Sequence, residues 1–136
     1  MTKLSAKHMN WLNFGAFDGT VLFVCGFTYG EIMNRFKNKK TSEGWVTAFE
    51  NTKNMWDDDT NHAFCSKEEV SGKTYFIMVL KNRFDFRDGS HATLAHEILH
   101  LISQNLPEFL DPMRENECFA YTHTFLMNQC YAILRK

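Results

Sequence analysis

The segment LAHEILHLI, residues 94–102, decides the predicted fold because it has the pattern of an amphipathic helix. Successive residues of an α-helix are rotated by about 100°, so its apolar side chains fall on one broad arc. The apolar members of residues 94–105 are Leu94, Ala95, Ile98, Leu99, Leu101 and Ile102. An apolar arc of this width has to pack against another layer of the fold. At the start of the helix, Ser90 is expected to cap the free N–H groups.

Two histidines and a glutamate lie outside this apolar arc. His96 and His100 are four residues apart, so they point the same way and can both bind one metal ion. Glu97 lies at the flank of the same face, where a carboxylate can accept a proton from a metal-bound water. This is the HExxH pattern of zinc hydrolases, with two ligands and a general base on one helix. The alternative is that both histidines are ordinary surface residues.

A third ligand is expected from the next helix, which is predicted to run from Asp111-Pro112 toward Leu134. Residues spaced three and four apart share one stripe of it, namely Glu117, Ala120, Tyr121, Thr124, Asn128 and Tyr131. The small Ala120 should allow close approach, so we expect Glu117 to complete a His₂Glu zinc site with one open position. Glu117 could instead be an ordinary exposed carboxylate, or one favoured by the positive end of its helix.

Tyr121 lies one turn beyond Glu117 on the same stripe and is a candidate donor to a developing oxyanion. The alternative for Tyr121 is packing, or a hydrogen bond that orients Glu117. His91 lies about 140° from His96 around the helix and should not bind the same ion. The remaining histidines are expected to be surface or hydrogen-bonded structural residues, namely His8, His62 and His123.

Residues from about 73 to 134 resemble the small zincin-like metallopeptidase proteins encoded in tailed bacteriophage genomes. The resemblance rests on HEILH at residues 96–100 followed by ECFAY at residues 117–121. More broadly the chain resembles gluzincins, in which the third ligand is a Glu on the following helix. The resemblance implies a zinc site and a hydrolytic fold, acting on peptide bonds, with no known substrate. The first half of the chain matches much more loosely.

Composition agrees with one folded domain. The 136 residues are 44% hydrophobic and include 13 Phe, which favours a sizeable core. A net charge of −1 gives no electrostatic case for nucleic acid, and no apolar run is long enough to span a membrane. The N-terminus lacks the pattern of a secretory signal, and the 4 Cys show no Cys-x-x-Cys spacing. Together with these features, the resemblance to phage proteins implies a protein of the host cytoplasm or of the virion.

The clearest β signal is a hairpin whose strands, 63–70 and 73–81, flank Ser71-Gly72. Its second strand is apolar on both faces and should lie in the core against the HExxH helix. Earlier in the chain we expect a weakly helical lead-in, a strand and two helices, at residues 3–13, 20–25, 29–39 and 45–56. Residues 57–59 are three aspartates, which mark a solvated turn more readily than a cation site.

The sequence thus predicts one α+β domain over residues 1–136, a minimal zincin-like fold. Residues 1–60 form its N-terminal strand and helix portion, and residues 61–136 hold the hairpin, the HExxH helix and the Glu-ligand helix. A small mixed or antiparallel sheet should pack on these two helices. The leading function is a zinc-dependent metallopeptidase that acts on a peptide or protein substrate. The alternative is a phage structural, accessory or host-interaction protein with a structural or vestigial metal site.

Overall fold

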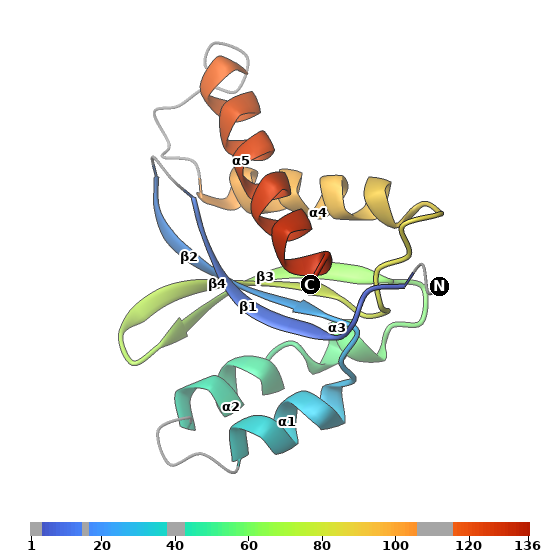
Figure 1. Cartoon of the computed structure of the whole chain (residues 1–136). Helices are drawn as coiled ribbons and strands as arrows, with labels where there is room; N and C mark the ends of the chain where they lie inside the picture. Colours follow the sequence, from blue (N-terminus) through green and yellow to red (C-terminus); the bar gives the residue numbers. More distant parts are fainter. Residues whose placement is uncertain (1–3, 15–16, 38–42, 106–115) are drawn as a thin grey trace.

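The computed structural model describes residues 4–14, 17–37, 43–105 and 116–136 (Figure 1). Four strands form one mixed sheet in the order β1-β2-β4-β3. Their bounds are His8–Phe14 for β1, Phe17–Cys25 for β2, Ala63–Val70 for β3 and Lys73–Leu80 for β4. β2 and β4 are parallel, whereas the β1/β2 and β3/β4 pairs are antiparallel. The predicted α+β class with a small mixed sheet is therefore confirmed.

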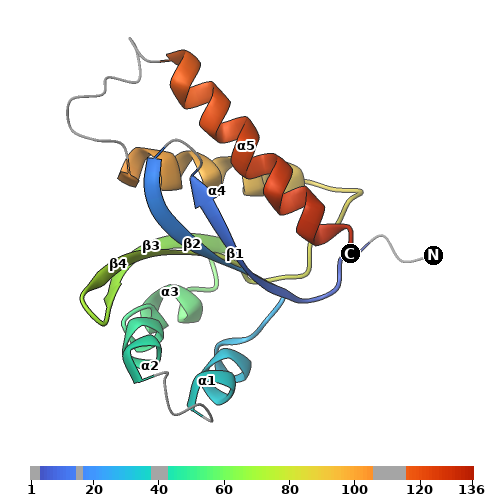
Figure 2. The same cartoon turned by 60° about the vertical axis from the view of Figure 1, so that its left-hand side comes forward.

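Helices cover both faces of the sheet, which gives three layers (Figures 1 and 2). One face carries α4 (Ser90–Asn105) and α5 (Asn116–Leu134). The other carries α1 (Tyr29–Lys37), α2 (Glu43–Glu50) and α3 (Lys53–Asp57). Each face has its own buried apolar cluster. None of the helices in the described part of the chain is both long and apolar enough to cross a membrane.

The predicted β3/β4 hairpin is confirmed, and its turn explains its register. Ser71 and Gly72 both have positive φ, at 53° and 81°, as a two-residue type I′ turn requires. Val70 pairs with Lys73 directly across the turn, and the register continues without a shift to the pair Ala63 and Leu80. The turn thereby fixes which side chains of β3 face α4.

β4 is buried on both faces, as its continuous apolar run predicts. Phe76, Met78 and Leu80 belong to the cluster beneath α4 and α5. Ile77 and Val79 belong to the cluster on the opposite face, beneath α1 and α2. Since consecutive strand residues point to opposite faces, one strand supplies the centre of both cores.

A reciprocal capping box starts α1. The backbone N–H of Glu31 donates to Thr28 Oγ1 at 3.2 Å, and the N–H of Thr28 donates to Glu31 Oε1 at 3.0 Å. Lys7 also donates to Glu31 Oε2 at 2.7 Å. These contacts connect Lys7, just before β1, to the first turn of α1, which follows β2 in the chain.

The expected lead-in at residues 3–13 is wrong for most of its length, because His8–Phe14 forms strand β1. Its side chains alternate between the two cores: Leu12 and Phe14 join the cluster beneath α5, while Met9 packs against the cluster beneath α1. The alternation combines polar and apolar residues on both faces, so it lacks the simple pattern of a half-buried strand. The strand conformation of β1 therefore depends on pairing with β2 and is not indicated by its own sequence.

The single helix predicted for residues 45–56 is also wrong, because the chain forms α2 and α3 with a break between them. Thr52 lies at the break and is fully buried. Its hydroxyl donates to the carbonyl of Phe49 at 2.7 Å and accepts from the Trp56 indole at 3.1 Å. A threonine that satisfies backbone and side-chain groups locally competes with continued helix formation.

The face of α5 that packs differs from the predicted stripe. Of that stripe, Glu117, Ala120, Tyr121, Thr124 and Asn128 are exposed to solvent. The buried residues are instead Thr122, Leu126, Cys130, Ile133 and Leu134. Burial of the apolar arc determines how a helix rotates on its neighbour, and this arc lies away from Glu117. The predicted cap at Asp111-Pro112 falls outside the described residues.

At the edge strand β1, a side chain pairs with the outward backbone groups of one residue. Gln129 of α5 donates from Nε2 to the carbonyl of Asn13 at 2.8 Å and accepts from its N–H at 3.2 Å. The amide thus pairs with β1 as a neighbouring strand would. β3, at the opposite edge, pairs with β4 alone among the described strands.

Thr28→Ala should lower the free energy of unfolding by about 1 kcal/mol, because it removes the oxygen that accepts from the Glu31 amide. Urea unfolding followed by circular dichroism measures the change. Thr28→Ser keeps the hydroxyl and should remain close to the parent protein. Equal losses in both variants would show that the cap does not carry the effect.

The hydrogen bond from Lys7 lowers the pKa of Glu31 from its usual 4.5 to about 2, with a smaller effect from the Thr28 amide. Because the folded-state pKa is depressed, this stabilisation is present above pH 4.5 and disappears as the pH falls toward 2. The difference in Tm between the parent and Glu31→Gln should therefore shrink from about pH 5 to about pH 2.5. A difference that is constant over this range would contradict the assignment.

Candidate functional site

The start of α4 sets the direction of the candidate site. Oδ1 of Asp88 accepts from both the backbone N–H and the hydroxyl of Ser90, each at 2.8 Å. Asp88 therefore caps the helix in place of the predicted Ser90, whose hydroxyl accepts from the Asp85 amide at 3.2 Å. These bonds to Ser90 lower the pKa of Asp88.

His96 and His100 lie together on the exposed side of α4. Their Nε2 atoms are 3.0 Å apart, with one ring donating to the other, and their ring centroids are 4.6 Å apart. Two imidazole nitrogens bound tetrahedrally to one zinc ion at about 2.05 Å would be about 3.3 Å apart. The predicted pairing of the two imidazoles is thus present, and their separation is close to what a shared ion needs.

Glu97 lies at the boundary between α4 and the sheet, and only 6% of its surface is exposed. The thiol of Cys65, on the edge strand β3, lies 3.2 Å from Glu97 Oε2 and 3.2 Å from the Glu97 carbonyl. Burial, followed by the negative charge of Glu97, raises the pKa of the Cys65 thiol. The thiol is therefore protonated and acts as the donor.

A hollow of about 350 Å³ joins these groups to the sheet edge. Its lining residues are Asn61, Ala63, Phe64, Cys65, His96, Glu97, His100 and Gln104. His96, His100 and Glu97 therefore line one space between α4 and β3. A group bound to the imidazoles and a chain lying along β3 would share this space.

Glu117 is not brought to the two imidazoles. α5 meets α4 near His123, which donates from Nε2 to the carbonyl of Ala95 at 3.1 Å. Glu117 precedes His123 by six residues, which is about 9 Å along the helix axis and about 120° around it. It is exposed, and among the described residues no three His, Cys, Asp or Glu side chains are grouped closely enough to bind a metal ion.

Tyr121 also points away from the hollow, since 73% of its surface is exposed and it is not among the lining residues. His91 is a hydrogen-bonded residue: Nδ1 accepts from the Tyr131 hydroxyl and Nε2 donates to the Phe86 carbonyl at 3.1 Å. His123 is likewise satisfied, by Ala95. The predicted set thus divides into two adjacent imidazoles with Glu97 in the same hollow, and two residues of α5 that are exposed to solvent.

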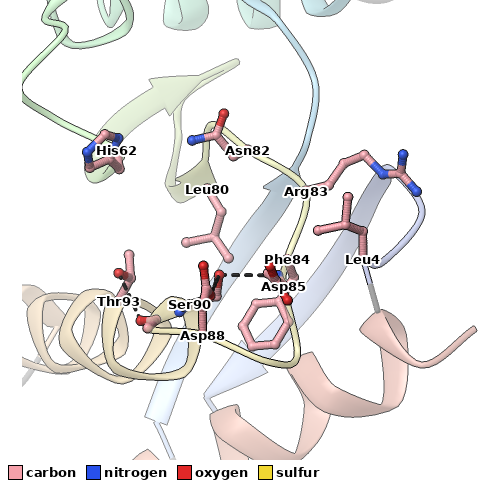
Figure 3. A pocket seen from close by; sticks show the side chains of 11 residues that line it. Leu4, His62, Leu80, Asn82, Arg83, Phe84, Asp85, Asp88, Ser90 and Thr93 are labelled. Atoms are coloured by element: carbon pink, nitrogen blue, oxygen red, sulfur yellow. Dashed lines mark hydrogen bonds between the residues drawn. The ribbon is translucent and has the colours of Figure 1, made fainter. Parts of the chain in front are cut away.

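A larger hollow of about 460 Å³ lies at the other end of α4, beside the last residues of β4 (Figure 3). Its lining includes His62, Asp85 and Asp88, and Asp88 is hydrogen-bonded to Ser90. Among the described residues, no cluster of potential metal ligands occurs there. Two carboxylates beside the start of the helix also disfavour an anion. Chemistry is therefore better supported at the His96–His100 end.

Sequence reasoning missed Cys65. Its position is recoverable from the hairpin, because the turn at Ser71-Gly72 fixes the alternation of β3 and places Ala63, Cys65 and Lys67 on the α4 side. What the sequence does not contain is the position along α4 at which β3 passes. That position depends on how the helix settles on the apolar side chains of β4.

The chain was compared with known proteins at three levels. No family model matches it, and no curated protein or solved structure matches it either. A functional proposal therefore rests on the geometry of α4 and β3 and on the sequence motifs at residues 96–100 and 117–121.

Proposed function

We propose that this protein is a small zinc-dependent hydrolase, of the phage metallopeptidase type, that cleaves peptide bonds. His96 and His100 bind the metal ion and Glu97 is the general base. The observation that carries the proposal is the exposed imidazole pair, 3.0 Å apart, beside a buried carboxylate in one hollow. Paired ligands and a nearby base are the arrangement that metal-assisted hydrolysis requires.

The third ligand in this proposal is Glu117, supported by the resemblance of residues 117–121 to the second motif of gluzincins. Its carboxylate has to approach α4, and α5 already contacts α4 at His123 and Ala95. The approach requires the first turns of α5 to rotate or shift toward His96. Zinc binding could offset the free energy of such a shift, because ligand binding to one conformation stabilises it.

In the proposed hydrolase, the imidazoles, Glu97 and Tyr121 have different roles. Zinc held by the imidazoles would supply Lewis acidity, lowering the pKa of water and polarising a carbonyl. Glu97 accepts the proton of the attacking water and then delivers it to the leaving amine. Its burial beneath β3 keeps competing solvent away from one side of the carboxylate. Tyr121 has the oxyanion-donor role only if α5 moves together with Glu117.

The edge strand β3 provides a way to hold an extended peptide. The amide of Lys81 donates to the carbonyl of His62 at 3.0 Å, so these two form a hydrogen-bonded pair across the hairpin. By the alternation of an antiparallel ladder, the backbone groups of Ala63, Cys65 and Lys67 then point toward the open edge. A substrate that adds to this edge would cross the hollow beside Glu97.

A second candidate is a phage structural, accessory or host-interaction protein that keeps this scaffold with a structural or vestigial metal site. The exposure of Glu117 and the absence of a three-residue metal group in the described ranges favour it. Catalysis separates the two candidates, because only the hydrolase depends on Glu97 for turnover while metal binding depends on the imidazoles.

Protein purified without added metal should contain about one zinc per chain by elemental analysis, and His96→Ala or His100→Ala should lose it. Glu97→Gln should keep the zinc but abolish cleavage of a fluorogenic peptide mixture. His62→Ala is the matched control, since His62 is exposed and lies outside the hollow. Zinc retained in both α4 variants, or cleavage retained in Glu97→Gln, would refute the proposal.

Glu117→Gln should weaken zinc binding by more than about 100-fold, because losing a ligand exceeds the effect of losing a residue that only supports one. Competition with a chromogenic chelator measures the affinity. Glu69→Gln, an exposed carboxylate on β3, should bind zinc as the parent does. Equal affinities in the parent and Glu117→Gln would remove Glu117 from the site and favour the accessory protein.

A further inference from the structure

Cys65 is in direct contact with the proposed general base. Its Sγ atom lies 3.2 Å from Oε2 of Glu97 and 3.2 Å from the backbone carbonyl of the same residue. The two acceptors belong to different parts of Glu97, so the thiol contacts both the helix backbone and the end of the side chain. A single thiol proton can be shared between them or directed at the carboxylate, which is the stronger acceptor.

The carboxylate has few other restraints. Among the described residues, Cys65 is the only one whose hydrogen bond to the Glu97 side chain is observed, and it engages Oε2. Among the same residues, the one buried side-chain nitrogen or oxygen atom that lacks a hydrogen-bond partner is Nε2 of His8. Oε1 of Glu97 is therefore not fully buried, and Glu97 is among the residues that line the hollow.

Placement on a strand makes this contact rigid. β3 is held to β4 in an unbroken register, and Cys65 is opposite Met78, which is fully buried in the core beneath α4. The side chain of Cys65 has a single rotatable bond before sulfur. A donor so placed restrains the torsions of the longer glutamate side chain, which would otherwise sample several rotamers.

We propose that Cys65 is a positioning residue: its thiol holds Oε2 of Glu97 against the edge strand, so that Oε1 is aimed at the space next to His96 and His100. The role of Glu97 as a base rests on the proposed function, whereas the thiol–carboxylate contact does not. In the hydrolase, the contact fixes which oxygen receives the proton of the attacking water. Cys65 itself is neither a metal ligand nor a nucleophile in this proposal.

The contact is tested by infrared spectroscopy of the S–H stretching band, which lies apart from other protein bands. Subtracting the spectrum of Cys65→Ala from that of the parent isolates the Cys65 thiol. The same subtraction in a Glu97→Gln background should show the band shifted to higher frequency, because a neutral amide accepts more weakly than a carboxylate. Cys118, a half-buried thiol on α5 outside the hollow, is the matched control and its band should not move.

An unshifted Cys65 band would overturn the proposal whether or not the protein is an enzyme. Thermal unfolding of each variant shows whether it remains folded. Zinc content should be the same in the parent, Cys65→Ala and Cys65→Ser, and a loss of zinc in Cys65→Ala would make Cys65 a ligand and also refute the positioning role.

Activity provides the second readout. With zinc-loaded protein and a fluorogenic peptide mixture, Cys65→Ala should lower kcat about tenfold with little change in KM, as expected for loss of a group that orients a reacting residue. Cys65→Ser keeps a donor and should recover most of kcat. Equal kcat values in the parent and Cys65→Ala would contradict the proposal. If the parent cleaves nothing, the hydrolase proposal fails, and the infrared result alone decides whether the thiol holds Glu97.

Discussion

The packing of α4 on the sheet is the constraint on which the arrangement of the candidate site depends. Leu94, Ile98, Leu101 and Ile102 are essentially fully buried against the side chains of β4 and its neighbours. Burial of four large aliphatic side chains contributes several kcal/mol, far more than any polar contact of the helix. The helix cannot rotate without exposing them, so the imidazole pair faces solvent and Glu97 is held at the boundary with β3.

The two edges of the sheet differ in what lies against them, and the edge for which the described residues show no pairing side chain lies beside the candidate site. At β1 the amide of Gln129 occupies the outward backbone groups of Asn13. At β3 the hollow with Glu97 lies along the edge, and exposed charged side chains such as Lys67 and Glu69 limit unwanted pairing. An open edge is a liability for aggregation unless it is protected or used for binding. Its position beside the imidazole pair supports the use proposed for it.

Short sequence patterns predicted the elements that a few neighbouring residues specify. They failed for elements whose conformation or orientation depends on contacts between residues far apart in the sequence. The Ser71-Gly72 turn and the apolar arc of residues 94–102 were sufficient for the hairpin and for α4, because a type I′ turn and an amphipathic helix are specified within a few residues. β1 is specified by pairing with β2, and the rotation of α5 by burial of residues such as Leu126. The paired imidazoles could be predicted because they share one helix. The position of Glu117 could not, because it depends on where α5 crosses α4.

The burial of the Glu97 side chain bears on which of the two proposed functions is better supported. Burying a carboxylate requires compensation by hydrogen bonds or opposite charge, and the one donor observed among the described residues is the thiol of Cys65, which is a weak donor. A scaffold that needed only to pack α4 on β3 would be better served by an apolar side chain at this position. Departures from local stability are expected where a site needs a particular group. A largely buried carboxylate on the same helix as two paired imidazoles therefore supports the catalytic proposal more than a vestigial site, even with Glu117 exposed to solvent.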